Sequence, residues 1–173
     1  LIERASALRV GNGLDESSQM GPVISRESLN RVCTYIERGQ TDGAILALDG
    51  RQAHIEGHAD GNFVGPTIFD NATPDMGIIT DEIFGPVLSV MNVADFDRAV
   101  NTLELSRYGN AASIFTQNGR SARDFSYRVH AGNIGVNIGV AAPIAAFPFG
   151  GMKESGLGRE LGHEGLDAYL ETK

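Results

Sequence analysis

Residues 87–93, VLSVMNV, are an almost uninterrupted apolar run, and the predicted fold class follows from what comes after it. A short run of this kind is typical of a β-strand that is buried on both faces of a sheet. Asp95 comes next and can cap a helix, because its carboxylate can accept hydrogen bonds from the free N–H groups of a first turn. In that helix Phe96, Val100 and Leu103 share one face at helical spacing. The region therefore predicts a strand followed by a packed helix.

The same alternation continues along the chain. Residues 111–116, AASIFT, predict the next strand, a second helix is expected from about Ser121 until Gly132, and residues 133–138, NIGVNI, predict a third strand. Strands joined by helical crossovers pair in parallel and lie in one sheet. We therefore predict an α/β fold, with an open, mainly parallel sheet and flanking helices.

The first half is less regular. Residues 1–11 predict a leading helix, and Ser25 can cap a second helix that is expected to stop at Gly39. Residues 44–48, AILAL, and 63–69, FVGPTIF, predict two strands, separated by a polar surface excursion.

Composition excludes several function classes. The chain has 173 residues and a net charge of −8, and its only lysines are Lys153 and Lys173, so a nucleic-acid surface is not expected. The sequence contains no apolar stretch of membrane-spanning length. The single cysteine, Cys33, fits a reducing compartment, and a cytoplasmic protein is predicted. Because the chain begins without Met and in the middle of a helical pattern, we expect it to be a piece of a longer protein.

Three apparent motifs do not indicate a metal site, a nucleophile or a dinucleotide-binding loop. His54 and His58 could share a metal on a helix, but the glycines around them argue against a helix. Cys33 lies on the buried stripe of its predicted helix, whereas nucleophilic cysteines need exposure and a neighbouring base. The glycines at residues 11–13 and 155–158 do not complete a GxGxxG dinucleotide loop.

The stretch 80–86, TDEIFGP, places two carboxylates beside a ring. Pro86 favours an extended chain before it, so Glu82 and Phe84, two residues apart, can serve one ligand. A carboxylate can accept hydrogen bonds from both hydroxyls of a sugar diol, and a ring offers a flat apolar wall to a planar base. The alternative is a solvated acid pair followed by a core phenylalanine.

Four segments together resemble the NAD(P)-dependent aldehyde dehydrogenase superfamily: EIFGPV (82–87), YGNAASIFT (108–116), GNIGVN (132–137) and PFGGMKESGLGRELG (148–162). The resemblance implies that residues 1–173 are the C-terminal part of the catalytic domain. The Rossmann domain and the segment with the nucleophilic cysteine would then lie upstream of Leu1. In this family that cysteine attacks the aldehyde, a hydride passes to NAD, and the resulting thioester is released to water or to coenzyme A (CoA).

Segments such as RVCTYIERG (31–39) and GNFVGPTI (61–68) are most similar to the CoA-acylating methylmalonate-semialdehyde dehydrogenase branch of the superfamily. This similarity implies a small substrate, malonate or methylmalonate semialdehyde, with CoA as the acyl acceptor. The tail at 148–162 instead has the general aldehyde dehydrogenase form. A hydrolytic aldehyde dehydrogenase is therefore one alternative, and a non-catalytic assembly module is another.

The resemblance also implies a role for individual residues. Glu82 corresponds to the glutamate that binds the nicotinamide ribose, and Phe84 to the aromatic residue at the nicotinamide, with Asp81 as a support or a solvent-facing neighbour. Phe149 corresponds to a residue that lines the substrate tunnel, and Asn137 is a candidate near the same cavity.

Other expectations concern the whole protein. NAD is the expected cofactor, with NADP possible, and the parent enzyme is expected to be a homodimer or homotetramer. Gly150, Gly151 and Gly156 are expected to serve backbone geometry, and Arg159 and Glu160 a structural role. Alone, the chain is expected to be inactive.

Overall fold

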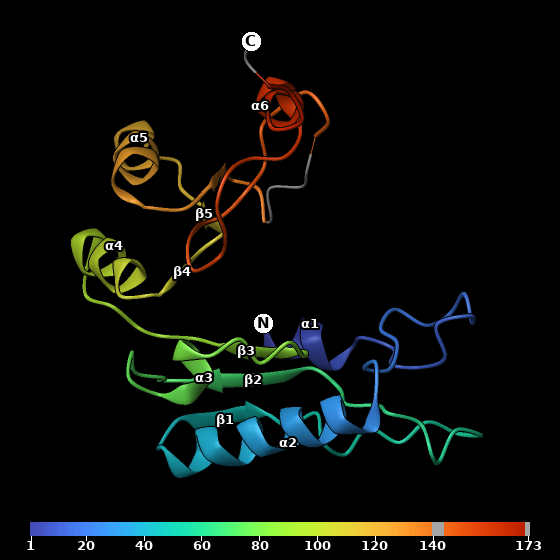
Figure 1. Cartoon of the computed structure of the whole chain (residues 1–173). Coiled ribbons are helices and arrows are strands. Elements are labelled where there is room, and N and C mark those ends of the chain that lie inside the picture. The colour runs from blue at the N-terminus through green and yellow to red at the C-terminus, as the bar shows by residue number, and fades with distance from the viewer. Residues whose placement is uncertain (140–143, 172–173) are drawn as a thin grey trace. The chain divides into compact units, whose positions relative to one another are not determined.

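A computed structural model describes residues 1–139 and 144–171 of the chain, which divides into two compact units, Leu1–Asn92 and Val93–Lys173. Figure 1 traces the elements of both units along the chain. Residues 140–143 and 172–173 lie outside the described residues. Among the described residues, no helix combines the length and the apolar character needed to cross a membrane.

The first unit combines a three-stranded sheet with three helices. The sheet order is β1-β2-β3, with β1 antiparallel and β3 parallel to the central β2. The elements of this unit, in chain order, are α1 (Ile2–Ser6), α2 (Arg26–Thr41), β1 (Ile45–Leu48), β2 (Thr67–Asp70), α3 (Gly77–Thr80) and β3 (Val87–Ser89).

The core of the first unit lies where α2 packs against the sheet and α3. Ser25 caps α2 as predicted, because its hydroxyl accepts a hydrogen bond from the Ser28 N–H at 3.1 Å. One face of α2 then buries Val32 and Ile36 completely, and they join Phe69 of β2 in one apolar cluster. Val32 and Ile36 of the predicted helical stripe thus build this core, whereas Cys33 is half-buried and lies outside the cluster.

The sequence pattern predicted that α2 ends at Gly39, and this prediction is wrong. The helix continues to Thr41, and Gly39 is buried inside its last turns. A methyl group on Gly39 would lie 2.8 Å from Phe69 Cζ and 2.9 Å from Ile78 Cγ2, both too close for an ordinary contact. Gly39 is thus required by the close approach of the helix to its neighbours and not by a turn.

The strand predicted at 87–93 is shorter and less buried than expected. β3 ends at Ser89, and Leu88 remains 47% exposed. The prediction of a strand buried on both faces is therefore wrong. Among the described residues Leu88 lines an open apolar cavity, so its side of the strand is not covered by another element.

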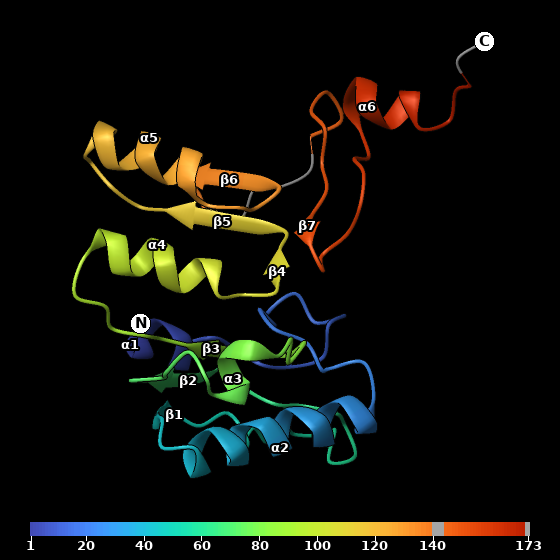
Figure 2. The ribbon, with the colours of Figure 1, turned by 60° about the vertical axis from the view of Figure 1, so that its left-hand side comes forward.

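The second unit contains one parallel strand pair with two helices packed on it. Figure 2 shows β5 and β6 side by side with α4 and α5 beside them. Asp95 caps α4 as predicted, with its Oδ1 accepting from the Arg98 N–H at 2.8 Å. The elements of this unit are α4 (Phe96–Glu104), β4 (Tyr108–Gly109), β5 (Ala111–Ile114), α5 (Gly119–Arg128), β6 (Asn133–Val136), β7 (Met152–Lys153) and α6 (Gly162–Asp167).

Both predicted limits of α5 need correction. The helix starts two residues before Ser121, because Asn118 Oδ1 accepts from the N–H groups of Arg120 and Ser121. It ends at Arg128, so Gly132 is not its stop. A side chain on Gly132 would overlap the Gly150 carbonyl, so this glycine is required by the close approach of two backbone segments.

The α/β class is confirmed, but the strands form several small sheets. Parallel pairing links β2 to β3 and β5 to β6, while β4 and β7 form a short antiparallel pair. His130 lies just past α5, and its Nδ1 is 2.7 Å from Glu104 Oε2. This contact ties the end of α5 to the end of α4.

The close packing at Gly39 leads to a stability prediction. We expect Gly39→Ala to lower the free energy of unfolding by about 1–3 kcal/mol, because overpacking outweighs the better helix propensity of alanine. Urea denaturation measures the change. The control is Gly119→Ala in α5, where the new methyl group would meet only Arg123 Nη1 at 3.7 Å. A Gly39 variant as stable as the Gly119 variant would contradict this account.

Candidate cofactor-binding loop and substrate cavity

The predicted cofactor motif forms a loop between α3 and β3. α3 ends at Thr80, and Asp81 takes up an extended conformation with φ −107° and ψ 149°. Ile83 is buried in the main core, whereas Glu82 and Phe84 on either side of it are exposed. The loop therefore turns one apolar side chain inward and presents a carboxylate and an aromatic ring outward, which fits the predicted ligand contact.

Glu82 has an open carboxylate. Within the described residues, no hydrogen bond or ion pair of the Glu82 side chain is present. Its neighbour Asp81 is instead held inward, since the Tyr35 hydroxyl donates to Asp81 Oδ2 at 3.1 Å and Arg38 Nη1 lies 4.0 Å from the same oxygen. Of the two adjacent acids, Asp81 serves the fold and Glu82 faces solvent.

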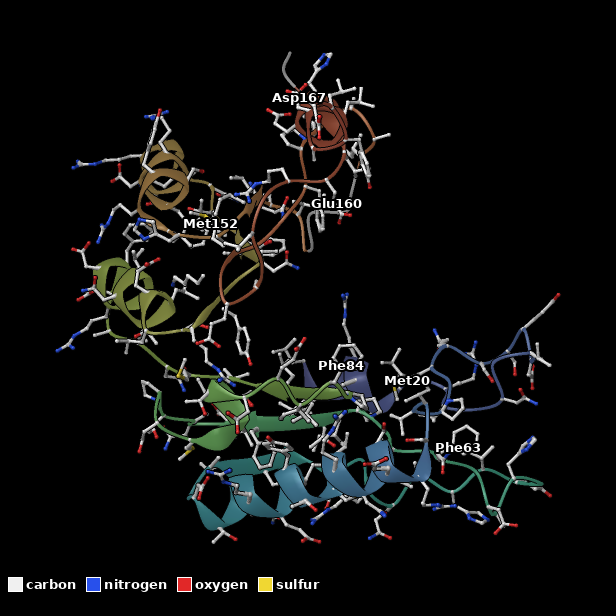
Figure 3. The ribbon with its side chains drawn as sticks, in the orientation of Figure 1. Met20, Phe63, Phe84, Met152, Glu160 and Asp167 are labelled. Carbon is white, nitrogen blue, oxygen red and sulfur yellow. The ribbon has the colours of Figure 1, made fainter. Side chains whose placement is uncertain are left out.

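Phe84 is strained as well as exposed. The residue is 75% exposed on the surface of the first unit (Figure 3), and its backbone has φ 55°, in the left-handed region. A bulky side chain rarely adopts this conformation, which costs on the order of 1–2 kcal/mol. Pro86 had suggested an extended chain before it, but the conformation of Phe84 shows that the loop is not extended throughout.

An apolar cavity of about 470 Å³ opens beside the loop. Gly85 and Pro86 contribute to its wall, but Glu82 and Phe84 do not. The lining residues come from α1, β2, β3 and the loops next to them: Leu1, Arg4, Ala5, Leu8, Met20, Pro66, Thr67, Ile68, Gly85, Pro86, Val87 and Leu88. The predicted contact pair thus lies at the surface next to this cavity and not inside it.

Phe149 lies in a cavity of the second unit. Its backbone forms an isolated antiparallel bridge with Glu160, with N–O distances of 2.7 and 2.8 Å in the two directions. The half-buried Phe149 then helps to line a space of about 290 Å³ together with Phe147, Pro148 and Asn133. This position is compatible with the predicted role in lining a substrate tunnel.

Asn137 has a structural task in the same unit. Its Oδ1 accepts from the Thr116 N–H at 2.8 Å, and its Nδ2 donates to the Thr116 carbonyl at 3.0 Å. The side chain therefore continues the β5–β6 pairing by one more step. Asn137 does not line the Phe149 cavity, and its assignment to the substrate site stays a prediction.

Arg159 is structural, as expected. Its Nη1 donates to the carbonyls of Gly151 and Gly158, which closes the glycine-rich segment on itself. A side chain on Gly151 would come within 2.5 Å of Ser155 Cβ, so this glycine has a geometric role. Gly156 has φ 147°, a conformation that side chains rarely adopt.

Cys33 and the histidines offer no competing site. Cys33 is half-buried, and burial raises the pKa of its thiol above the ordinary value, which disfavours the thiolate that a nucleophile requires. In the part of the chain that the structure describes, no cluster of His, Cys, Asp and Glu could hold a metal ion.

Sequence reasoning missed Tyr35 as a partner of the motif loop. The residue lies on α2, far from Asp81 in sequence, and only the folded contact joins them. A signal was present nonetheless, because Tyr35 sits three residues after Val32 and therefore near the buried stripe.

Comparison with known proteins assigns the chain to a family. The model of the aldehyde dehydrogenase family matches residues 1–173, so the chain belongs to this family. It is 45% identical over 175 aligned residues to malonate-semialdehyde dehydrogenase of Bacillus velezensis, covering all of this chain and 35% of that protein. It is 43% identical to the mitochondrial acylating methylmalonate-semialdehyde dehydrogenase of Arabidopsis thaliana, of which it covers 29%.

A solved structure agrees with this assignment. A crystal structure described as a methylmalonate-semialdehyde dehydrogenase from Sinorhizobium meliloti 1021, complexed with NAD, superposes with a TM-score of 0.97 at 38% identity. The match covers 100% of this chain and 36% of that one. The chain thus spans about a third of the length of these relatives. Coverage gives the extent of a match and not its position, and the C-terminal placement stays a prediction.

The conformation of Phe84 can be tested without any ligand. Phe84→Gly and Phe84→Ala both remove the ring, but only glycine relieves the left-handed backbone, so we expect the glycine variant to be more stable by about 1 kcal/mol. Chemical denaturation of the two variants measures the difference. At Phe115, which is exposed without a positive φ, the order should reverse. If alanine were the better substitute at both positions, the strain at Phe84 would be refuted.

Proposed function

We propose that the chain is part of an enzyme that oxidises a small semialdehyde, malonate or methylmalonate semialdehyde, with NAD as the hydride acceptor. The observation that carries the proposal is the similarity of the whole chain to semialdehyde dehydrogenases at 43–45% identity. It is supported by the open carboxylate of Glu82 and the exposed side chain of Phe84, which both belong to the motif that suggested a cofactor contact.

The residues present fit one end of NAD. Glu82 would accept hydrogen bonds from the hydroxyls of the nicotinamide ribose, and Phe84 would lie against the nicotinamide and limit the access of water to it. Bound NAD would supply the hydride acceptor of the reaction. The described residues contain no phosphate-cradling glycine loop, and the pyrophosphate would be held by other parts of the longer protein. NADP in place of NAD is compatible with this arrangement.

Residues of the second unit would contact the substrate. Phe149, fixed by its backbone bridge to Glu160, would form an apolar wall near the aldehyde. Asn137 contributes indirectly, because its amide holds the end of the β5–β6 pair.

The nucleophile of the reaction would come from outside residues 1–173. Cys33 is a poor candidate because burial raises the pKa of its thiol. We therefore propose that the chain alone is inactive. For the complete enzyme we propose, from the family resemblance, a cytoplasmic homodimer or homotetramer.

CoA is the acyl acceptor that we propose for the complete enzyme. The CoA thiol would attack the thioester carbonyl, form the CoA thioester and release the enzyme thiol. The similarity to an acylating relative supports this choice. The general form of the tail at 148–162 favours hydrolysis by water as the second candidate.

Glu82 provides the first test, in the longer protein that contains this chain. We expect Glu82→Gln to raise the Kd for NAD by about tenfold or more, because a charge-assisted acceptor is replaced by a neutral one. The free energy of unfolding should change by less than about 0.5 kcal/mol, as for other surface substitutions. Calorimetric titration with NAD measures binding, and Glu56→Gln is the control for an exposed glutamate outside the loop. Unchanged NAD binding would remove Glu82 from the site.

The acyl acceptor provides the second test. With malonate semialdehyde and NAD, we expect added CoA to accelerate turnover and to appear as a CoA thioester in the products. Chromatography with mass spectrometry separates that thioester from the free acid. Release of the free acid at a rate independent of CoA would establish the hydrolytic alternative instead.

A further inference from the structure

Helix α2 contacts the segment of residues 77–85 at three places, each about one helical turn from the next. A methyl group on Gly85 would lie 2.5 Å from Val32 Cγ2, and one on Gly77 would lie 2.8 Å from the Arg38 guanidinium carbon. Tyr35, between these two contacts on α2, donates its hydroxyl to Asp81. The backbone of the segment is therefore held against α2 at both ends, and the Tyr35 hydrogen bond holds its middle.

The Tyr35 hydrogen bond is the most specific of these restraints. The ion pair between Arg38 and Asp81 spans 4.0 Å, and the arginine side chain is 55% exposed, so solvent screens the pair. The hydroxyl of Tyr35 lies 3.1 Å from Asp81 Oδ2. Burial, and then the hydrogen bond to Asp81, raise the pKa of Tyr35 above its ordinary value, so that the hydroxyl keeps its proton and remains a donor.

Glu82 lies between two restrained residues. On one side the carboxylate of Asp81 is bound to α2, and on the other Ile83 is buried in the cluster that contains Val32 and Ile36. The Glu82 side chain itself carries no such restraint within the described residues. The orientation of the Glu82 side chain at the surface thus depends on how Asp81 and Ile83 are held.

We propose that Tyr35 is a positioning residue for the cofactor contact: by fixing Asp81 it holds the adjacent peptide so that Glu82 projects toward the ligand. This inference rests on the proposed function, because it assumes that Glu82 meets the nicotinamide ribose. Tyr35 itself touches neither cofactor nor substrate in this scheme.

A double-mutant cycle in the longer protein tests the proposal. Tyr35→Phe removes only the hydroxyl, and we expect it to raise the Kd and KM for NAD about threefold to tenfold, as for the loss of one hydrogen bond, while kcat changes less than about twofold. In the background of Glu82→Gln, the same substitution should have almost no further effect on NAD binding, because its action passes through Glu82. Calorimetric titration with NAD and steady-state kinetics measure the four proteins.

The control is Tyr127→Phe, which removes a hydroxyl from a tyrosine that is 88% exposed on α5. We expect it to leave NAD binding unchanged. A Tyr35 variant that binds NAD like the wild type would overturn the positioning role, and so would an effect that multiplies with that of Glu82→Gln. If Glu82→Gln itself binds NAD normally, the cofactor assignment fails and the positioning role fails with it.

Substitutions of Asp81 test the same hydrogen bond from the acceptor side, even if the Tyr35 variant does not fold. Asp81→Asn keeps an oxygen that can accept from Tyr35, so NAD binding should stay within about twofold of the wild type, whereas Asp81→Ala should match the loss seen with Tyr35→Phe. Equal NAD affinity in the asparagine and alanine variants would contradict the proposal.

Discussion

The close contact between α2 and the segment that leads into β3 is the constraint on which the first unit depends. α2 buries Val32 and Ile36 completely. Val32 lies so close to Gly85, and Gly39 so close to Ile78, that no side chain fits on either glycine. Close packing of this kind leaves little freedom for the loop that follows α3, because small displacements would create voids or overlaps. The orientation of Glu82 and Phe84 is therefore a consequence of core packing, although both residues lie at the surface.

Strain is concentrated in the same motifs. Five non-glycine residues among the described residues have positive φ, and four of them, Phe84, Asn137, Lys153 and Leu161, lie in segments that carry the family resemblance, whereas Asn71 does not. Such conformations persist only where the surroundings fix them. For Asn137 the hydrogen bonds to Thr116 provide that support. For Phe84 it comes from the burial of Ile83 and the packing of Gly85 on Val32.

The sequence predicted those features that depend on local pattern. The caps at Ser25 and Asp95 and the apolar stripe of α2 were recognisable because periodicity and capping chemistry act over a few residues. The motif of Glu82 and Phe84 was recognisable as a candidate because a carboxylate and a ring were spaced for one ligand.

Long-range contacts explain where sequence reasoning failed. Gly39 and Gly132 looked like helix stops, but each makes room for a segment distant in sequence. The exposure of Leu88 and the contact between Tyr35 and Asp81 likewise depend on which elements meet after folding. Neither apolar periodicity nor turn propensity carries that information.

The distinction between sequence pattern and folded contacts also bears on whether CoA or water is the acyl acceptor. The sequence of the tail at 148–162 was interpreted as the general aldehyde dehydrogenase form, but most of its contacts maintain backbone geometry. Arg159 binds two carbonyls, Phe149 and Glu160 form a backbone bridge, and Gly151 packs against Ser155. A segment whose residues chiefly shape a loop can be shared by enzymes with different acyl acceptors, because fold and chemistry vary independently. The general form of this tail is thus weak evidence for hydrolysis, and the proposal of CoA rests instead on the similarity of the whole chain to an acylating relative.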